Sequence, residues 1–83
     1  MVYFIRVPDG PVKVGYTNRN VKERLKELQA ASPYPLELIG TIAGGQQSEQ
    51  CVHRMFSGWR SQGGREWYDA DPIVIKAIDA LLS

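Results

Sequence analysis

The chain has 83 residues, of which 43% are hydrophobic and 23% are charged, and this composition is typical of an ordinary globular domain with one core. We therefore expect a single domain over residues 1–83. The one cysteine excludes an internal disulfide and a cysteine-based zinc site. No apolar run is long enough to cross a membrane, and the first residues lack the pattern of a signal peptide, so we expect a cytoplasmic protein without membrane contact.

The net charge of +1 says little, but the distribution of charge says more. Residues 1–65 carry nine Lys or Arg and five Asp or Glu, a net charge of +4, whereas residues 66–83 carry one Lys and four acids, a net charge of −3. A basic body with an acidic tail is suited to an anionic partner on one side. Affinity for a nucleic acid would then come from a few contacts and fall steeply with salt.

Two strands joined by a tight turn are expected at the start of the chain. Residues 2–7 (VYFIRV) are rich in β-branched and aromatic residues, and a second strand begins at about residue 12. Between them Pro8 presets the first turn position, and Gly10 is expected to supply the positive φ of a bulge. The sequence therefore predicts a β-hairpin with a three-residue loop.

The loop length determines which residues of the hairpin share a face. A three-residue loop places Tyr3 opposite Gly15 and Ile5 opposite Lys13, with all four on one face of the sheet. A two-residue loop would instead place Tyr3 opposite Tyr16. We favour the first register, because Pro-Asp-Gly fits the bulged turn.

A helix is predicted to follow, from about residue 20. Asn20 is expected to cap it, and Glu23 three residues later is expected to reach back to the Asn20 amide and complete a capping box. Its inward stripe is predicted to be Val21, Leu25 and Leu28. Arg24 lies beside Leu28 on the flank of this stripe, where a guanidinium needs a carboxylate, a carbonyl or a phosphate as partner.

The rest of the chain adds one long strand and two helices. Residues 36–43 predict a third strand, central or covered on both faces, and residues 65–68 a short extended segment. A second helix is expected over 46–56, and a final helix is expected to start with Asp71 as its cap and Pro72 at its first position. The predicted inward residues are Val52, Met55, Phe56 and Trp59, then Val74, Ile75, Ile78, Leu81 and Leu82. The order β-β-α-β-α-α predicts an α+β fold, a small three-stranded antiparallel sheet flanked by helices.

Glu49 and His53 lie one turn apart on the second predicted helix, at the edge of its buried stripe. A carboxylate there needs a cation or hydrogen-bond donors, so Glu49 is either a site residue or the partner of Arg24 in an internal ion pair. His53 either faces a ligand beside Glu49 or is an ordinary hydrogen-bonded helix histidine.

Several further residues also allow two interpretations. Tyr3 and Lys13 either present a phenol and an amine over one sheet face, or form part of the core and of the solvated surface. Cys51 is expected to be a small buried hydrophobe. The tryptophans and Tyr68 are expected to be core or lid aromatics. Surface arginines could extend a phosphate track that includes Arg19 and Lys22, namely Arg54, Arg60 and Arg65.

Taken together, several short segments resemble the GIY-YIG nuclease superfamily. They are Val2-Tyr3-Phe4-Ile5, Lys13-Val14-Gly15-Tyr16-Thr17, Arg24-Leu25, Glu49 with His53 and Phe56, and Glu66-Trp67-Tyr68. The narrower resemblance is to its small phage and bacterial branch, which has a Lys-Ile-Gly-x-Thr second motif and a terminal Glu-Trp-Phe. The similarity runs from about residue 2 to 68. Lys13 stands where the more familiar members have tyrosine.

This resemblance implies a metal-dependent endonuclease that hydrolyses DNA phosphodiester bonds. Glu49 would hold one divalent ion, Mg²⁺ or Mn²⁺, and Arg24 would contact the phosphate. Tyr3 would orient or deprotonate the attacking water, with Lys13 as the cation that assists it. The residues expected to contact substrate are Gly15, Tyr16, Thr17, Arg19 and His53.

The resemblance also bears on partners. DNA is the expected partner, and a domain of this size would form a homodimer or bind a partner protein, because nuclease members usually carry a second domain. The alternative function is a catalytically silent nucleic-acid- or protein-binding module on the same scaffold, since a fold does not determine a function.

Overall fold

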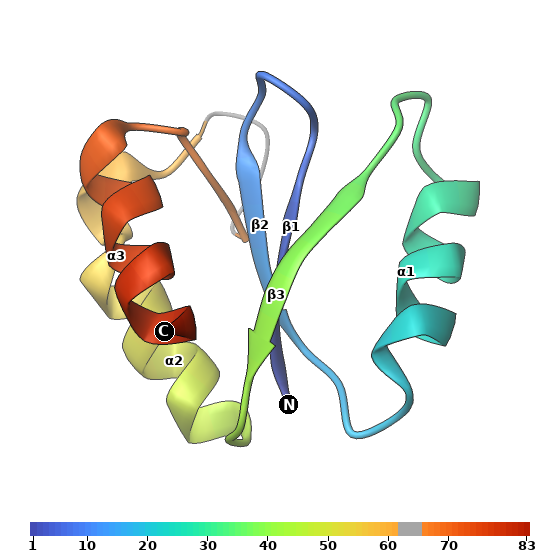
Figure 1. Ribbon diagram of the computed structural model, residues 1–83, viewed down its shortest axis with the longest axis horizontal. Coiled ribbons are helices and arrows are strands. Elements are labelled where there is room, and N and C mark those ends of the chain that lie inside the picture. The colour runs from blue at the N-terminus through green and yellow to red at the C-terminus, as the bar shows by residue number, and fades with distance from the viewer. Residues whose placement is uncertain (62–65) are drawn as a thin grey trace.

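Two hydrophobic strands form the centre of an antiparallel sheet. The computed structural model describes residues 1–61 and 66–83, and within these ranges the sheet has four strands in the order β3-β1-β2-β4. The strands are β1 (Val2–Arg6), β2 (Val12–Tyr16), β3 (Glu37–Ile42) and β4 (Trp67–Tyr68). Helix α1 (Val21–Ala30) lies on one face, and α2 (Gln46–Met55) and α3 (Pro72–Leu82) lie on the other (Figure 1). A short 3-10 helix, η1 (Ser57–Trp59), follows α2.

The α+β class is confirmed, but the strand count of three was wrong. The fourth strand is the predicted extended segment, of which Trp67 and Tyr68 pair with Lys13 and Val12 at the outer edge of β2. A two-residue strand has too little periodicity to be separated from a loop in the sequence. The part of that segment at Arg65 lies outside the described residues.

The predicted register of the first hairpin is confirmed. Tyr3 pairs with Gly15 and Ile5 with Lys13, so the two-residue loop is not formed. The positive φ of the turn, however, belongs to Asp9, at 57°, and not to Gly10. Aspartate is one of the few residues with a side chain that adopts this conformation readily, because its short polar group bonds locally.

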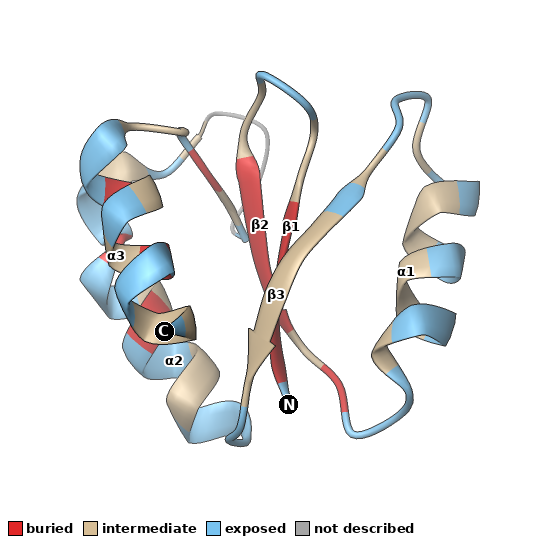
Figure 2. Cartoon of the chain, viewed as in Figure 1, coloured by how far each residue is buried: buried red, intermediate tan, exposed pale blue. Residues whose placement is uncertain are grey.

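The hydrophobic core lies between the sheet and the α2–α3 layer (Figure 2). Alternate residues of β1 and β2 face it, and helices α2 and α3 cover them. Its buried members are Val2, Phe4, Val12, Val14, Val52, Phe56, Tyr68, Val74 and Ile78. The other residues of β1 and β2 therefore face α1, as their alternation requires.

Helix α1 is held more loosely than α3. None of its residues is buried, and its predicted stripe of Val21, Leu25 and Leu28 is half-buried. Asn20 caps it by accepting a 2.8 Å hydrogen bond from the Lys22 amide, but within the described residues Glu23 makes no return bond, so the capping box was wrong. Asp71 caps α3 as predicted, with Pro72 at the first position.

Three predictions about packing were also wrong. Strand β3 is an edge strand with half-buried residues, so of its two predicted places, central or covered on both faces, the central one was wrong. On α2, Val52 and Phe56 face inward as predicted, but Met55 is 51% exposed and Cys51 is exposed. Each lies about 100° around the helix from its buried neighbour, which turns its side chain to solvent. No helix of the described residues has the length and apolar character needed to span a membrane.

Candidate metal centre

Three side chains with metal-binding atoms meet beside strand β2. Glu49 and His53 come from α2, and Glu66 comes from the residue just before β4. One ligand atom from each lies within 4.8 Å of the other two. Glu49 Oε2 and His53 Nε2 are 3.7 Å apart. The Glu66 side chain is 48% exposed. We call these three residues the Glu–His–Glu cluster.

The fold brings the cluster together through main-chain and core contacts. Val52 and Phe56 fix the inward face of α2, so that Glu49 and His53, one turn apart, lie together on its flank. Glu66 is fixed from the other side, because its carbonyl oxygen accepts a 3.0 Å hydrogen bond from the Val14 amide of β2.

His53 is oriented by a residue of the core. Its Nδ1 is hydrogen-bonded to the hydroxyl of Tyr68, which is fully buried, and the two ring centroids are 5.6 Å apart. His53 is therefore the hydrogen-bonded helix histidine of one interpretation, and its Nε2 faces Glu49. The other interpretation, that it faces a ligand, stays a prediction. Tyr68 is the core aromatic that was expected.

Lys13 joins the cluster to the opposite face of the sheet. Its side chain is not solvated, because the residue is only 9% exposed. The Nζ atom forms an ion pair with the Glu66 carboxylate and lies 5.7 Å from the centroid of the Trp67 ring. Glu66 thus pairs with the Lys13 ammonium and lies within 4.8 Å of the ligand atoms of α2.

Tyr3 and Arg24 form a second group on the α1 side of the sheet. Tyr3 is buried, and its ring and hydroxyl lie so close to Gly15 that a methyl group on this glycine would overlap them. Arg24 donates a hydrogen bond to the Tyr3 hydroxyl and another, of 3.2 Å, to Glu27. These two bonds, with Tyr3 as the larger cause, raise the pKa of Arg24 above its ordinary value.

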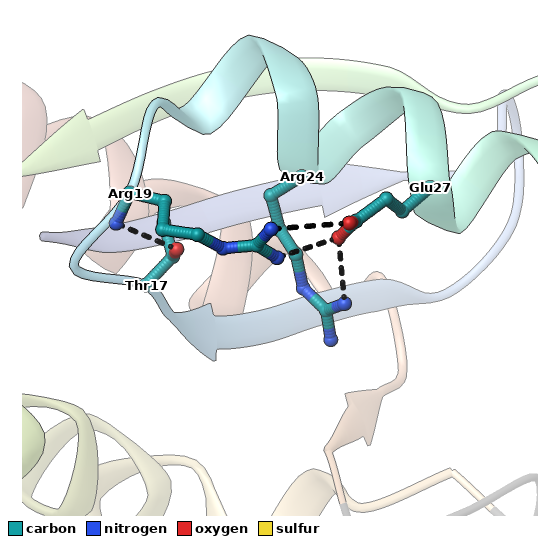
Figure 3. A network of polar contacts seen from close by, with 4 residues as sticks. All are labelled: Thr17, Arg19, Arg24 and Glu27. Atoms are coloured by element: carbon teal, nitrogen blue, oxygen red, sulfur yellow. Dashed lines mark hydrogen bonds and ion pairs between the residues drawn. The ribbon is translucent and has the colours of Figure 1, made fainter.

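A single carboxylate holds two arginines at the start of α1 (Figure 3). Glu27 accepts hydrogen bonds from Arg19 at 2.7 and 3.2 Å, and it also accepts one from Arg24. These hydrogen bonds lower the pKa of the Glu27 carboxyl below its ordinary value. The bonds from Arg19 have the larger effect and the bond from Arg24 the smaller. Thr17 is buried and its Oγ1 accepts from the Arg19 amide at 3.1 Å, which closes the turn after Tyr16.

The four predicted catalytic residues do not line one enclosed pocket. Tyr3, Lys13 and Arg24 lie on the α1 face of the sheet, and Glu49 lies on the α2 face. Within the described ranges no ion pair joins Arg24 to Glu49, and the internal ion pair proposed for them was wrong. Arg24 pairs with Glu27, and Glu49 Oε2 lies 3.7 Å from His53 Nε2.

Two other expectations concern residues near this site. Glu66 was not predicted as a site residue, although the Glu-Trp-Tyr segment that contains it contributed to the resemblance. The phosphate track is not continuous, because Arg54 belongs to α2, whereas Arg19 pairs with Glu27 of α1, the helix on the other face of the sheet. Arg65 lies outside the described residues.

Comparison with known proteins gives one family match. The model of the T5orf172 domain matches residues 1–82, nearly the whole chain. This is a different family from the GIY-YIG superfamily, so that resemblance was wrong. It depended on several short segments, each weak alone, whereas the match takes in almost every residue. No curated protein and no solved structure matches the chain significantly.

Proposed function

The chain belongs to the T5orf172 domain family, and from its site we propose that it is a metal-dependent endonuclease that hydrolyses DNA phosphodiester bonds. The observation that carries this proposal is the Glu–His–Glu cluster beside the Lys13 ammonium. Carboxylate oxygens and an imidazole nitrogen are metal-ligand groups, and nearby cations favour an anionic substrate. A divalent ion bound there would neutralise charge on a phosphate and activate water.

Arg24 is proposed to contact the phosphate. Its side chain is 37% exposed, so a ligand from solvent can reach it. A guanidinium has five donors, and those that bond to Tyr3 and Glu27 leave others for phosphate oxygens. Its attraction to the developing charge would be stronger in the transition state than in the ground state.

Tyr3 and Lys13 are proposed to support this group. The Tyr3 hydroxyl is buried and accepts a bond from Arg24, which favours positioning of the guanidinium over deprotonation of water. Lys13 lies on the same strand face, two residues from Gly15, on which Tyr3 packs. Displacement of its ammonium from Glu66 would make it available to the substrate.

The test is nicking of supercoiled plasmid with Mg²⁺ or Mn²⁺. Glu49→Ala is expected to lower the nicking rate by roughly 100-fold or more, because it removes a ligand that is fixed on a helix. The matched control is Glu37→Ala, which removes an exposed glutamate from β3 at the other edge of the sheet and should leave the rate unchanged. Equal nicking by wild type and Glu49→Ala would contradict the proposal.

A catalytically silent binding module is the second candidate. It is favoured by one observation, that the cations of the site are already paired within the chain, Lys13 with Glu66 and both Arg19 and Arg24 with Glu27. This candidate predicts DNA binding by the wild type without nicking under any divalent ion. A gel-shift assay beside the nicking assay separates the two functions.

A further inference from the structure

We infer that the metal site is a mixed nitrogen–oxygen centre, in which Glu49, Glu66 and Nε2 of His53 bind a transition-metal ion such as Mn²⁺ in preference to Mg²⁺, and in which Tyr68 is the positioning residue for His53. The inference rests on the proposed function in that both place the ion at Glu49. It goes beyond that function by naming the donor set, the class of ion and the residue that orients the nitrogen ligand.

The spacing of the donors suits one ion. With bonds of about 2.1 Å, neighbouring ligands of an octahedral ion are about 3.0 Å apart and opposite ligands about 4.2 Å apart. Glu49 Oε2 and His53 Nε2, at 3.7 Å, already lie between these two values. Glu66 completes the set within 4.8 Å, and its half-exposed side chain can close the remaining gap by a rotation.

The contacts of Tyr68 suit the tautomer of His53 that a metal ligand requires. The Tyr68 hydroxyl contacts both His53 Nδ1 and, at 3.5 Å, the carbonyl oxygen of His53. Binding of an ion through Nε2 requires the proton on Nδ1, and the Tyr68 hydroxyl is then placed to accept from Nδ1–H and to donate to this carbonyl. In this tautomer the lone pair of Nε2 faces Glu49 Oε2 at 3.7 Å, with room for an ion between the two atoms.

The nitrogen ligand determines the class of ion. Mg²⁺ takes oxygen ligands and gives up its water reluctantly, so an imidazole adds little to its binding. Imidazole suits first-row transition ions such as Zn²⁺ and Fe²⁺, and Mn²⁺, the member of this row that also suits carboxylates, fits a mixed set of one imidazole and two carboxylates. A partner that fixes the tautomer and orientation of a histidine ligand typically contributes about 10- to 100-fold to metal affinity. Tyr68 supplies that partner from the buried core.

Calorimetry on the full chain tests the ion preference. Wild type is expected to bind Mn²⁺ at least about tenfold more tightly than Mg²⁺, and His53→Gln is expected to remove this difference by weakening Mn²⁺ alone. Tyr68→Phe keeps the ring but removes the hydroxyl, and should weaken Mn²⁺ binding about tenfold. The matched control is Tyr34→Phe, at a tyrosine that is 63% exposed, with wild-type affinity expected.

Nitrogen NMR of the His53 ring tests the positioning role of Tyr68. A residue with a structural role alone would not determine the tautomer of His53. The chain contains one histidine, so its two ring nitrogens are assigned without ambiguity. We expect the Nδ1-protonated tautomer in the wild type and a change in the chemical shift of Nε2 when Zn²⁺ is added. In Tyr68→Phe we expect a mixture of the two tautomers. Should Tyr68→Phe fail to fold, the wild-type spectrum and His53→Gln still decide the question.

The outcomes separate this inference from the proposed function. Equal affinity of the wild type for Mn²⁺ and Mg²⁺, an Nε2-protonated ring, or unchanged Mn²⁺ binding by His53→Gln would overturn the inference even if Glu49-dependent nicking occurs. Conversely, Mn²⁺ preference that depends on His53, without nicking under any ion, would support the centre and contradict the endonuclease.

Discussion

At the scale of single residues, Gly15 determines where Tyr3 can lie. Its missing side chain leaves the space that the Tyr3 ring and hydroxyl occupy, directly across the hairpin. The same hydroxyl accepts the bond from Arg24. A small residue in β2 is therefore needed for the guanidinium on α1 to be held in place.

Substitution of Gly15 by alanine should accordingly disturb both stability and the site. Because Tyr3 is buried and cannot move freely, Gly15→Ala is expected to lower the free energy of unfolding by about 1–3 kcal/mol, as measured by urea denaturation. Gly58→Ala is the control, since a Cβ atom there would meet nothing within 4 Å. A Gly15→Ala variant as stable as Gly58→Ala would show that Tyr3 can lie elsewhere.

At the scale of elements, local chemistry predicted the hairpin and both side-chain caps, but it did not predict which strand is central. The Pro-Asp-Gly turn has few compatible geometries, and so its loop length determined the register of Tyr3 and Lys13. Strand order depends on distant pairings, for which a run such as residues 36–43 contains no signal. The orientation of Met55 likewise depends on which neighbour packs on the sheet.

Two isoleucines of α3 test how this helix packs against the sheet. Ile78 is buried in the core, whereas Ile73 on the same helix is 59% exposed. Ile78→Ala is expected to cost about 2–5 kcal/mol of unfolding free energy, because it removes buried contacts and leaves a cavity. Ile73→Ala should change it by less than about 0.5 kcal/mol. Similar losses from both variants would indicate that α3 does not pack as described.

At the scale of the whole molecule, the site is assembled from parts that are far apart in the chain. Lys13 and its partner Glu66 are 53 residues apart, and neither segment alone indicates the other. The sequence therefore predicted Glu49 and His53, which share a helix, but missed the third member of the cluster. The short motifs that suggested the GIY-YIG superfamily reflect local residue types. Local residue types alone did not identify the family that matches the whole chain.

Metal binding should stabilise the entire fold, since the ligands come from α2 and from the residue before β4. At free Mn²⁺ about 100 times its dissociation constant, the gain is about 2.7 kcal/mol. For a domain of this size that corresponds to a rise in melting temperature of roughly 10–20 °C. Differential scanning calorimetry should show this rise, its reversal by EDTA, and its loss in Glu49→Ala. A melting temperature indifferent to Mn²⁺ would argue against a bound ion.

The contact between Phe56 and Tyr68 has a wider consequence. Their rings meet edge to face with centroids 5.7 Å apart, and the Tyr68 phenol in turn reaches the imidazole of α2. The side chain of Tyr68 thus contacts both the hydrophobic core and a member of the Glu–His–Glu cluster. During evolution, changes at Phe56 would be constrained twice, once by the requirement to fold and once by the proposed ion-binding role of His53. Related sequences should therefore exchange these three rings together or not at all.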